Sequence, residues 1–239
     1  MRYILKQLCP PILWNLLGSI KRKVLIKIRR REGKINTRMN QKLSIYLEDN
    51  FIEQMDTWGY GTVWNEIQFL MFNCQGRVLD IACGTGKAIS ILSKQFPDIT
   101  VYGCDISEKM IERAVKDSIS RELLKVCDAT NTGYGDKYFD YAYSIGSIEH
   151  FTEDGIAGVI KECCRITKSF SFHLIPVSRS GVNEGWIKTQ DQDYFNNNQD
   201  WWLNKFGEYY ETLYILDSAW KGDSQFGKWF ICAKCKKID

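Results

Sequence analysis

Apolar residues along this chain alternate between short continuous runs and longer stretches in which they recur every three or four positions. The short runs predict buried strands, and the three- to four-residue spacing predicts amphipathic helices. We expect strands at residues 77–82, 99–105, 122–127, 139–145, 170–177, 208–217 and 228–234, and helices at 41–75, 86–96, 108–119 and 152–166. Because short strands alternate with helices, the pattern predicts an α/β fold with a doubly wound, parallel sheet.

Residues 10–31, PPILWNLLGSIKRKVLIKIRRR, have apolar positions at helical spacing and basic residues in their second half. One interpretation is a helix packed on the domain or on a partner subunit; the other is an interfacial helix lying on an anionic membrane leaflet. A signal peptide is not expected, because the bases follow the apolar part and no small-residue cleavage site stands out. We therefore predict a basic N-terminal helical arm at 1–40 and one domain at 41–239, with a polar, aromatic insertion at about 178–205.

Charge and cysteine content narrow the function classes. The arm carries eleven Lys or Arg residues and one Glu, yet the chain of 239 residues has a net charge of only +3, so the domain itself is acidic. This argues against nucleic acid as a partner. Nine cysteines lie in apolar segments, and no second CxxC accompanies Cys232–Cys235, so we expect reduced strand thiols in a cytoplasmic protein rather than a zinc site.

The stretch VLDIACGTG, residues 78–86, is a run of aliphatic residues that reaches an acid and continues into two glycines. Gly84 and Gly86 let the backbone turn sharply and let a ligand approach it closely. A dinucleotide fingerprint needs a third glycine where this chain has Ile89, and a phosphate-binding P-loop needs Ser or Thr where Lys87 is followed by alanine. The turn therefore favours a nucleoside ligand without a pyrophosphate.

Acids lie at or near the ends of successive predicted strands. Asp105 can accept hydrogen bonds from both hydroxyls of a ribose, and Asp128 can accept one from an adenine amino group while the N–H of Ala129 donates to the ring. Simpler interpretations remain open: Asp80 could cap its own turn, Asp105 the next helix, and Asp128 could form a turn. A nucleoside would lie across these strand ends if the acids share one edge of the sheet.

The glycine turn, these acids and the run FDYAYSIGSIEH resemble, in order and spacing, the class I S-adenosylmethionine-dependent methyltransferases over about residues 58–235. The resemblance implies a Rossmann-like sheet of seven strands, mostly parallel with the last strand antiparallel, and helices on both faces. It also implies the cofactor S-adenosylmethionine, with S-adenosylhomocysteine as product. The implied cofactor-binding residues are Asp80, Ala82, Cys83, Gly84, Gly86, Asp105, Ile106, Asp128, Ala129, Ser144 and Ile145. One departure is that Ala82 stands where such proteins usually have their first glycine.

Methyl transfer from a sulfonium needs an aligned acceptor and, for a hydroxyl, a base that takes its proton. His150 follows the fourth strand near this edge and is our candidate base, with Glu149 as a weaker one; alternatively the pair simply begins the next helix. His173 lies within a predicted strand and is expected to be a core residue. No carboxylate cluster suggests a catalytic metal ion, so we expect a metal-independent enzyme.

Aromatic and amide residues flank the predicted edge, as expected for a site that stacks on a sugar ring and binds its hydroxyls. The expected acceptor-binding residues are Tyr60, Trp64, Trp186, Tyr194 and Trp201, although some of these aromatics could be lid or interface core. Asn196 or Asn197 could cap a helix that carries the tryptophans at 201 and 202.

The segment LCPPILWNLLGSIKR also resembles the N-terminal part of bacterial surface-polysaccharide biosynthesis proteins, including glycan methyltransferases. That resemblance implies O-methylation of a sugar in a polysaccharide or a lipid-linked precursor. It places the arm against an anionic inner membrane face or a glycosyltransferase complex. The alternatives are a methyltransferase for a small metabolite or lipid, such as a quinone precursor, and a catalytically silent subunit that binds the cofactor. The sequence leaves the oligomeric state open.

Overall fold

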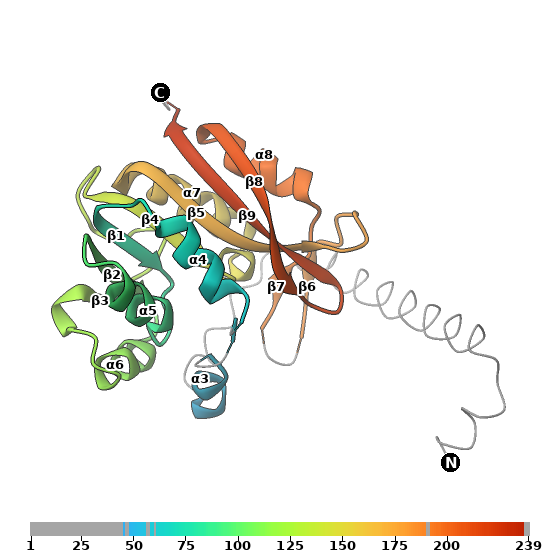
Figure 1. The fold of residues 1–239 in the computed structure, drawn as a ribbon. Coiled ribbons are helices and arrows are strands. Elements are labelled where there is room, and N and C mark those ends of the chain that lie inside the picture. Colours follow the sequence, from blue (N-terminus) through green and yellow to red (C-terminus); the bar gives the residue numbers. More distant parts are fainter. Residues whose placement is uncertain (1–44, 46–47, 56–57, 60, 190–191, 237–239) are drawn as a thin grey trace, which may run out of the picture.

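The computed structural model describes residues 45, 48–55, 58–59, 61–189 and 192–236, which build one α/β unit (Figure 1). The predicted arm at 1–40 lies outside these residues. The elements in chain order are α3 (Asp49–Met55), α4 (Val63–Met71), β1 (Gly76–Ile81), α5 (Lys87–Gln95), β2 (Ile99–Asp105), α6 (Glu108–Lys116), β3 (Leu124–Val126), β4 (Phe139–Ile145), α7 (Glu153–Ile166), β5 (Thr167–Ser178), β6 (Trp186–Ile187), β7 (Tyr194–Phe195), α8 (Gln199–Gly207), β8 (Tyr210–Lys221) and β9 (Gln225–Cys235). No helix in the described part of the chain is both long and apolar enough to cross a membrane.

The main sheet has seven strands in the order β3-β2-β1-β4-β5-β9-β8. The pairs β1–β2, β2–β3, β1–β4 and β4–β5 are parallel, and β9 runs antiparallel to both β5 and β8. The strand order reverses between β1 and β4, which is where a doubly wound sheet opens a crevice at the carboxyl ends of its strands. The expected seven-stranded sheet with an antiparallel last strand is confirmed.

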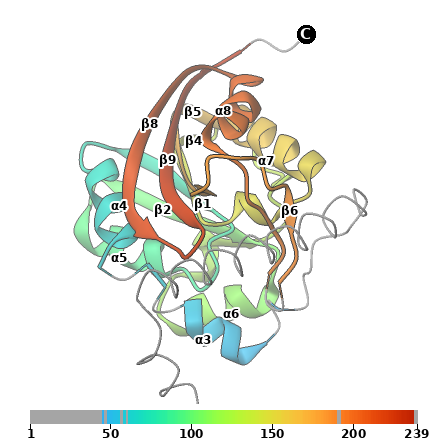
Figure 2. The same cartoon turned by 90° about the vertical axis from the view of Figure 1, so that its right-hand side faces the viewer.

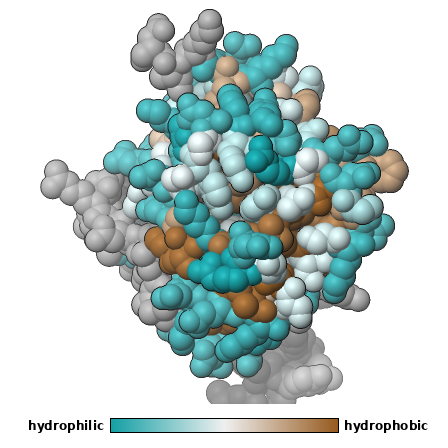
Figure 3. All heavy atoms as spheres, turned by 90° about the vertical axis from the view of Figure 1, so that its left-hand side faces the viewer, coloured by the Kyte–Doolittle hydropathy of each residue, from teal (hydrophilic) through white to brown (hydrophobic). Residues whose placement is uncertain are grey.

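Helices flank the sheet on both faces (Figure 2), and an apolar layer lies between the sheet and the helices on each face. The helices α4, α5 and α6 bury residues such as Ile67, Leu92 and Ile111 on one face, and α7 and α8 bury residues such as Ile160 and Phe206 on the other. The helical spacing of these residues makes each helix apolar on one side only. That side packs against the sheet, and the polar side faces solvent. Figure 3 shows this from outside: hydrophilic side chains dominate the face drawn there, with apolar ones in a band across its middle.

Several element boundaries differ from the prediction. The helical stretch expected at 41–75 contains two short helices, α3 and α4, and the strand expected at 122–127 starts with a 3₁₀ turn at Arg121–Leu123. The insertion forms a two-stranded sheet of β6 and β7, which the sequence pattern did not predict because each strand has only two residues. Its helix α8 is capped by Asn198, whose side chain accepts a hydrogen bond from Trp201 N, and not by Asn196 or Asn197.

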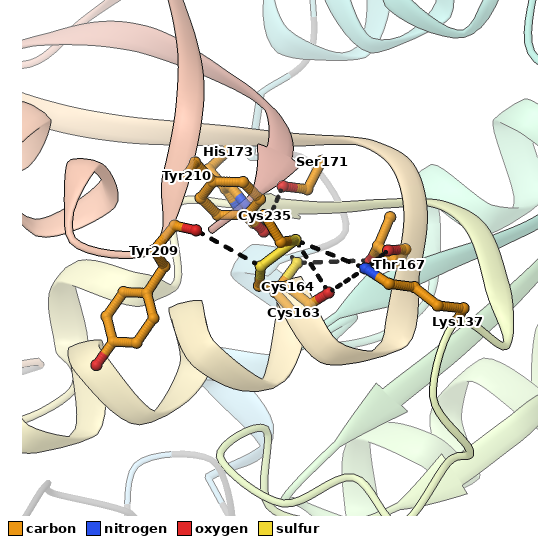
Figure 4. The surroundings of a disulfide bond; sticks show 9 residues. All are labelled: Lys137, Cys163, Cys164, Thr167, Ser171, His173, Tyr209, Tyr210 and Cys235. Atoms are coloured by element: carbon orange, nitrogen blue, oxygen red, sulfur yellow. Dashed lines mark hydrogen bonds between the residues drawn. A yellow bond between two sulfur atoms is a disulfide. The ribbon is translucent and has the colours of Figure 1, made fainter. Parts of the chain in front are cut away.

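The cysteines are not all reduced, which corrects the expectation from the sequence. Cys164 at the end of α7 and Cys235 at the end of β9 form a disulfide, with a sequence separation of 71 residues (Figure 4). The helix and the antiparallel last strand bring these two residues together, and only the fold shows that they are neighbours. Cys232, the other member of the CxxC spacing, is a free thiol buried in the core.

Candidate active site

A cavity of about 340 Å³ opens at the carboxyl ends of the central strands. Its lining comes from two regions of the molecule. The β1–α5 turn and the ends of β2 and β3 form one side, and residues near Trp58, the end of β4, the insertion and the β8–β9 hairpin form the other. The volume falls in the range of sites for small molecules and cofactors.

The β1–α5 turn has left-handed backbone at every second residue: φ is 56° at Ala82, 54° at Gly84 and 74° at Gly86. A Cβ on Gly84 would meet no atom within 4 Å, so this glycine leaves open space on the cavity side. This is a cradle in which a ligand can approach the main chain, and it fits the methionine part of S-adenosylmethionine. Ala82 adopts the same left-handed conformation as a glycine at that position would, at a cost in backbone strain.

Asp105 at the end of β2 holds this turn in place. Its Oδ2 accepts a hydrogen bond from Gly84 N at 2.9 Å, and its Oδ1 accepts one from Ser107 N at 2.8 Å. Burial raises the pKa of this carboxyl, while the backbone N–H groups that it accepts from oppose the increase. A carboxylate oxygen can accept more than one hydrogen bond, so Asp105 can hold the turn and still bind ribose hydroxyls. The helix after it is capped by Ser107, not by Asp105.

Asp80 lies at the bottom of the cavity and is 3% exposed. Burial raises its pKa well above the usual range, and the charge of Asp105 adds to this, while the hydroxyl of Tyr143 opposes it. Because burial disfavours the charged carboxylate, a positive charge or a hydrogen-bond donor placed next to Asp80 would stabilise it. The chemistry of a ligand with an ammonium and a sulfonium group fits such a site.

Residues suited to an adenine ring line the same side. Ile106 is 42% exposed at the cavity, and Asp128 and Ala129 follow β3. Asp128 forms a local turn, since its Oδ1 accepts from both the N and Oγ1 of Thr130 at 2.8 Å. Asp128 therefore forms a turn and is also the candidate residue for binding adenine. Cys83 on this side and Ile145 at the end of β4, on the opposite side, are further expected residues that line the cavity.

Two expected cofactor residues do not line the cavity. Gly86 begins α5, where a Cβ would come within 2.4 Å of Ile119 Cδ1 and 3.2 Å of Ala114 Cβ, so its part is close helix packing. Ser144 is fully buried, and its Oγ lies 2.9 Å from Nδ1 of His173. His173 is the core residue that the sequence predicted, with 0% exposure.

His150 and Glu149 lie together in the 3₁₀ turn after β4, and both line the cavity. His150 Nδ1 is 2.9 Å from the carbonyl oxygen of Asp193, so Nδ1 carries the proton and Nε2 is the acceptor. Burial lowers the pKa of His150 to about 4 and raises the pKa of Glu149 to about 8. At neutral pH the pair is thus a neutral imidazole 3.7 Å from a protonated carboxyl, not a salt bridge.

The expected acceptor residues divide into two groups. Trp64 and Tyr194 line the cavity, whereas Trp186 and Trp201 do not, and Tyr60 lies outside the described residues. Trp186 and Trp201 both pack on the ring of Phe195, with centroids 4.8 and 5.4 Å away, so they form the core of the insertion. The alternative interpretation, in which some of the aromatics form the core of a lid or interface and do not bind the acceptor, therefore applies to Trp186 and Trp201.

The structure adds cavity residues that the sequence analysis did not name as site residues. They are Phe51, Met55, Trp58, Thr85, Lys87, Ala88, Cys104, Met110, Cys127, Gly146, Ser147, Phe151, Pro176, Thr189, Gln192, Trp220 and Gln225. Thr85 lies inside the quoted turn and Lys87 directly after it, so both could have been found there. Trp220 and Gln225 reach the cavity only because β8 and β9 add to the far side of the sheet, and no local signal marks them. Within the described ranges, no three His, Cys, Asp or Glu side chains are grouped so that they could hold a metal ion.

Known proteins resemble this chain over the same region. Residues 78–169 match the family described as methyltransferase domain. A demethylmenaquinone methyltransferase from Thermotoga maritima is 29% identical over 136 residues, covering 54% of this chain and 58% of that protein. A tRNA (carboxymethyluridine(34)-5-O)-methyltransferase from Saccharomyces cerevisiae is 35% identical over 133 residues, covering 54% and 46%. The chain thus spans about half the length of these curated relatives.

Among solved structures, 1,6-didemethyltoxoflavin-N1-methyltransferase from Burkholderia thailandensis, with bound S-adenosylhomocysteine, has a TM-score of 0.63. It is 14% identical, and the match covers 81% of this chain and 89% of that one. At this identity the likeness concerns the fold. Residues 78–169 thus match a methyltransferase domain, and the glycine turn, the strand-end acids and the sheet order around them are those expected of the class I S-adenosylmethionine-dependent methyltransferases.

Proposed function

We propose that this protein transfers a methyl group from S-adenosylmethionine to a hydroxyl of a sugar, in a surface polysaccharide or a lipid-linked glycan precursor. The observation that carries the proposal is the position of His150. Its Nδ1 is held by a backbone carbonyl, which leaves Nε2 as a proton acceptor in the cavity that also contains the Gly84 turn. A hydroxyl acceptor needs such a base, whereas many nitrogen acceptors do not.

Different residues of the chain bind the cofactor, orient the acceptor and take its proton. When bound, S-adenosylmethionine supplies a methyl group on a positively charged sulfur. Asp105 binds the nucleoside, the backbone of the Gly84 turn holds the methionine part, and the cavity walls orient the acceptor hydroxyl. His150 Nε2 takes the proton that the hydroxyl loses as its oxygen becomes methylated. Oε1 of Glu149 lies 3.7 Å from this nitrogen and faces the imidazolium that results.

The charges around the cavity support a neutral acceptor. Its acidic lining residues are Asp80, Asp105, Asp128 and Glu149, and Lys87 is the one Lys or Arg among the described lining residues. With a single cation in its described lining, the cavity offers a phosphate or carboxylate acceptor little attraction. Neutral groups such as the amide of Gln225 and the hydroxyl of Tyr194 can bind sugar hydroxyls instead.

A second candidate is a small ring compound such as a quinone precursor. Half-buried tryptophans at positions 58, 64 and 220 line the acceptor side, and flat aromatic rings stack well on such walls. The relative from Thermotoga maritima, whose name refers to demethylmenaquinone, favours the same class. Both candidates use the same cofactor site and the same base.

The cofactor and acceptor can be tested separately. Calorimetry with S-adenosylmethionine, S-adenosylhomocysteine and NAD should show binding of the first two and none of NAD. Release of S-adenosylhomocysteine is then measured with methyl glycosides, nucleotide sugars, lipid-linked oligosaccharides and menadiol. Turnover of a sugar acceptor supports the proposal, turnover of menadiol alone supports the second candidate, and cofactor binding without turnover of any acceptor favours a silent subunit.

Location follows from the basic arm. We propose that residues 1–40 attach a cytoplasmic domain to an anionic membrane face or to a glycosyltransferase complex, because eleven basic residues accompany one acid there. Flotation with vesicles of phosphatidylglycerol and phosphatidylethanolamine compares the full chain with a chain lacking residues 1–40. Equal flotation of the two would overturn the membrane part of the proposal.

A further inference from the structure

Strand β8 is irregular near its end, opposite the start of β9. Asp217 pairs with Lys228, and Lys221 pairs with Phe226. An advance of four residues along β8 is therefore matched by an advance of only two residues along β9. The intervening residues leave the regular ladder, and Trp220 N donates to Ser218 Oγ at 3.0 Å instead. An irregularity of this kind redirects the side chains next to it and recurs beside active sites.

A carboxylate from another element fixes this irregular segment. Glu66 on α4 accepts a hydrogen bond from Ser218 Oγ at 2.7 Å and one from Ala219 N at 2.6 Å. It also accepts one from Trp229 Nε1 at 2.7 Å, on the adjacent strand β9. Three donors from two strands therefore converge on one side chain. They are separated from it by 152 to 163 residues in sequence.

The irregular segment directs Trp220 toward the cavity, which it lines. Its ring lies 6.0 Å from that of Trp58, centroid to centroid, and a Cβ on Gly222 would come within 3.1 Å of Trp220 Cη2. Trp58 in turn covers Gly146: a Cβ there would lie 2.9 Å from Trp58 Cη2 and 3.6 Å from Glu149 Oε1. Trp58 and Trp220 together form one wall of the cavity, which extends to Gly146 and Glu149 beside the proposed base.

An unpaired polar atom next to this wall points to a ligand. Glu149 is 3% exposed, and its Oε2 has no hydrogen-bond partner among the described residues. Leaving a buried carboxyl oxygen unpaired costs free energy that a bound acceptor would recover. An apolar wall beside an unpaired polar atom suits a ring with one flat, apolar face and a polar group at its edge.

We infer that Trp220 is an acceptor-specificity residue and that Glu66 is a positioning residue, which acts on the acceptor site through the irregular segment 218–220. The inference rests on the proposed function, because the wall has an acceptor only if methyl transfer occurs. Glu66 touches neither cofactor nor acceptor. Its effect on the reaction passes through the placement of the Trp220 ring against Trp58.

The positioning part can be tested without an acceptor. The full chain is labelled with 5-fluorotryptophan, and the ¹⁹F resonances that disappear in Trp220→Phe and Trp58→Phe are assigned to those rings. We expect Glu66→Gln to shift both resonances, because an amide cannot accept all three hydrogen bonds. The same change at Glu112, exposed on α6, is the matched control and should shift neither. Unshifted resonances in a folded Glu66→Gln variant would overturn the positioning role.

The specificity part uses whichever probe is methylated, a methyl glycoside or menadiol. We expect Trp220→Ala to raise the KM of that probe about tenfold, with the affinity for S-adenosylhomocysteine unchanged. Glu66→Gln should raise the same KM several-fold, and much less in the Trp220→Ala background, because its effect passes through Trp220. Equal effects in both backgrounds would show a merely structural role.

Failure of this inference is distinguishable from failure of the proposed function. If no probe is methylated, titration of methyl α-glucoside or menadiol into the labelled protein with bound S-adenosylhomocysteine reports on the wall directly. A shift of the Trp220 resonance supports the specificity role. A probe that shifts other resonances but leaves those of Trp220 and Trp58 in place contradicts it, whatever the outcome for turnover.

Discussion

The two sides of the cavity are built in different ways. The cofactor side comes from strand ends that are close in sequence, residues 80–86, 105–106 and 128–129, and depends on backbone conformation and buried carboxylates. The acceptor side brings together Trp58, the turn at His150, the insertion and Trp220 from segments spread over most of the described chain. The first side is a local motif repeated along a sheet edge, and the second exists only after folding.

This difference explains why one side is general and the other specific. A backbone cradle holds the part of a ligand that all members of the class share, so its geometry needs few side chains. The acceptor side uses side chains on loops and on a strand irregularity, which change without disturbing the sheet. Substitutions on the two sides should therefore separate cofactor binding from acceptor chemistry, and the following changes test this, from the largest expected effect to the smallest.

His150→Gln should leave S-adenosylhomocysteine affinity unchanged and lower kcat about 10²- to 10³-fold, because the proton acceptor is lost. Steady-state kinetics and calorimetry on the same sample measure both quantities. Tyr194→Phe keeps the ring next to His150, at a centroid distance of 6.2 Å, and removes only a hydroxyl proposed to bind the acceptor, so it should raise the KM of a sugar and leave kcat nearly unchanged. A wild-type kcat in the Gln variant would remove His150 from the mechanism and place the acceptor proton elsewhere.

Gly86→Ala and Gly84→Ala compare two glycines of one turn. Gly86→Ala should destabilise the fold by about 2–4 kcal/mol, because the methyl group would overlap Ile119 Cδ1 in a strained conformation. Gly84→Ala has only the backbone strain, about 1 kcal/mol, but places a methyl group in the cradle and should weaken cofactor binding. Denaturant unfolding and calorimetry check the pair. Equal stability losses would contradict the division of roles.

Asp105→Asn should weaken S-adenosylhomocysteine binding about 10- to 100-fold, since an amide keeps one acceptor oxygen but loses the charge. The hydrogen bond to Gly84 N or to Ser107 N must also weaken, so thermal unfolding should occur at a lower temperature. An exposed acid that does not line the cavity, Asp117→Asn, is the control. Unchanged affinity would show that Asp105 only supports the turn.

Glu149→Gln should stabilise the protein more as the pH rises. The folded carboxyl keeps its proton up to about pH 8, whereas an unfolded one loses it near its ordinary value, so wild-type stability falls between these values. Each pKa unit corresponds to about 1.4 kcal/mol, which makes the gain at pH 8 on the order of a few kcal/mol and small at pH 5. Unfolding at both values measures it. His150 titrates in both proteins, so its contribution cancels in the difference between their free energies of unfolding.

Ala82→Gly should have the smallest effect. It removes the left-handed strain at a φ of 56° but increases the entropy of the unfolded chain, so a net stabilisation below about 1 kcal/mol is expected. Cofactor affinity should stay the same or rise slightly. A clear loss of affinity would show that the methyl group of Ala82 contacts the ligand and that this departure from the usual glycine is functional.

The sheet and the cofactor side could be predicted because their signals are local. Strand residues such as Val78 and Val101 form apolar runs, Asp105 is the last residue of its strand, and Gly84 lies in the turn after β1. Ser144 and Trp201 were misplaced for the opposite reason. Each stands next to a correct signal in sequence, but the alternation of a strand and the turn of a helix direct their side chains away from the cavity.

The sequence by itself determined the class of this protein, since hydrophobic spacing sets the order of strands and helices, and parallel strands bring their terminal acids to one edge. Only the tertiary structure decided how the acceptor side is formed. The disulfide of Cys164 with Cys235, and the three hydrogen bonds from β8 and β9 to Glu66, join residues 71 to 163 positions apart. Contacts at such separations depend on how the layers pack, and no short stretch of sequence encodes them.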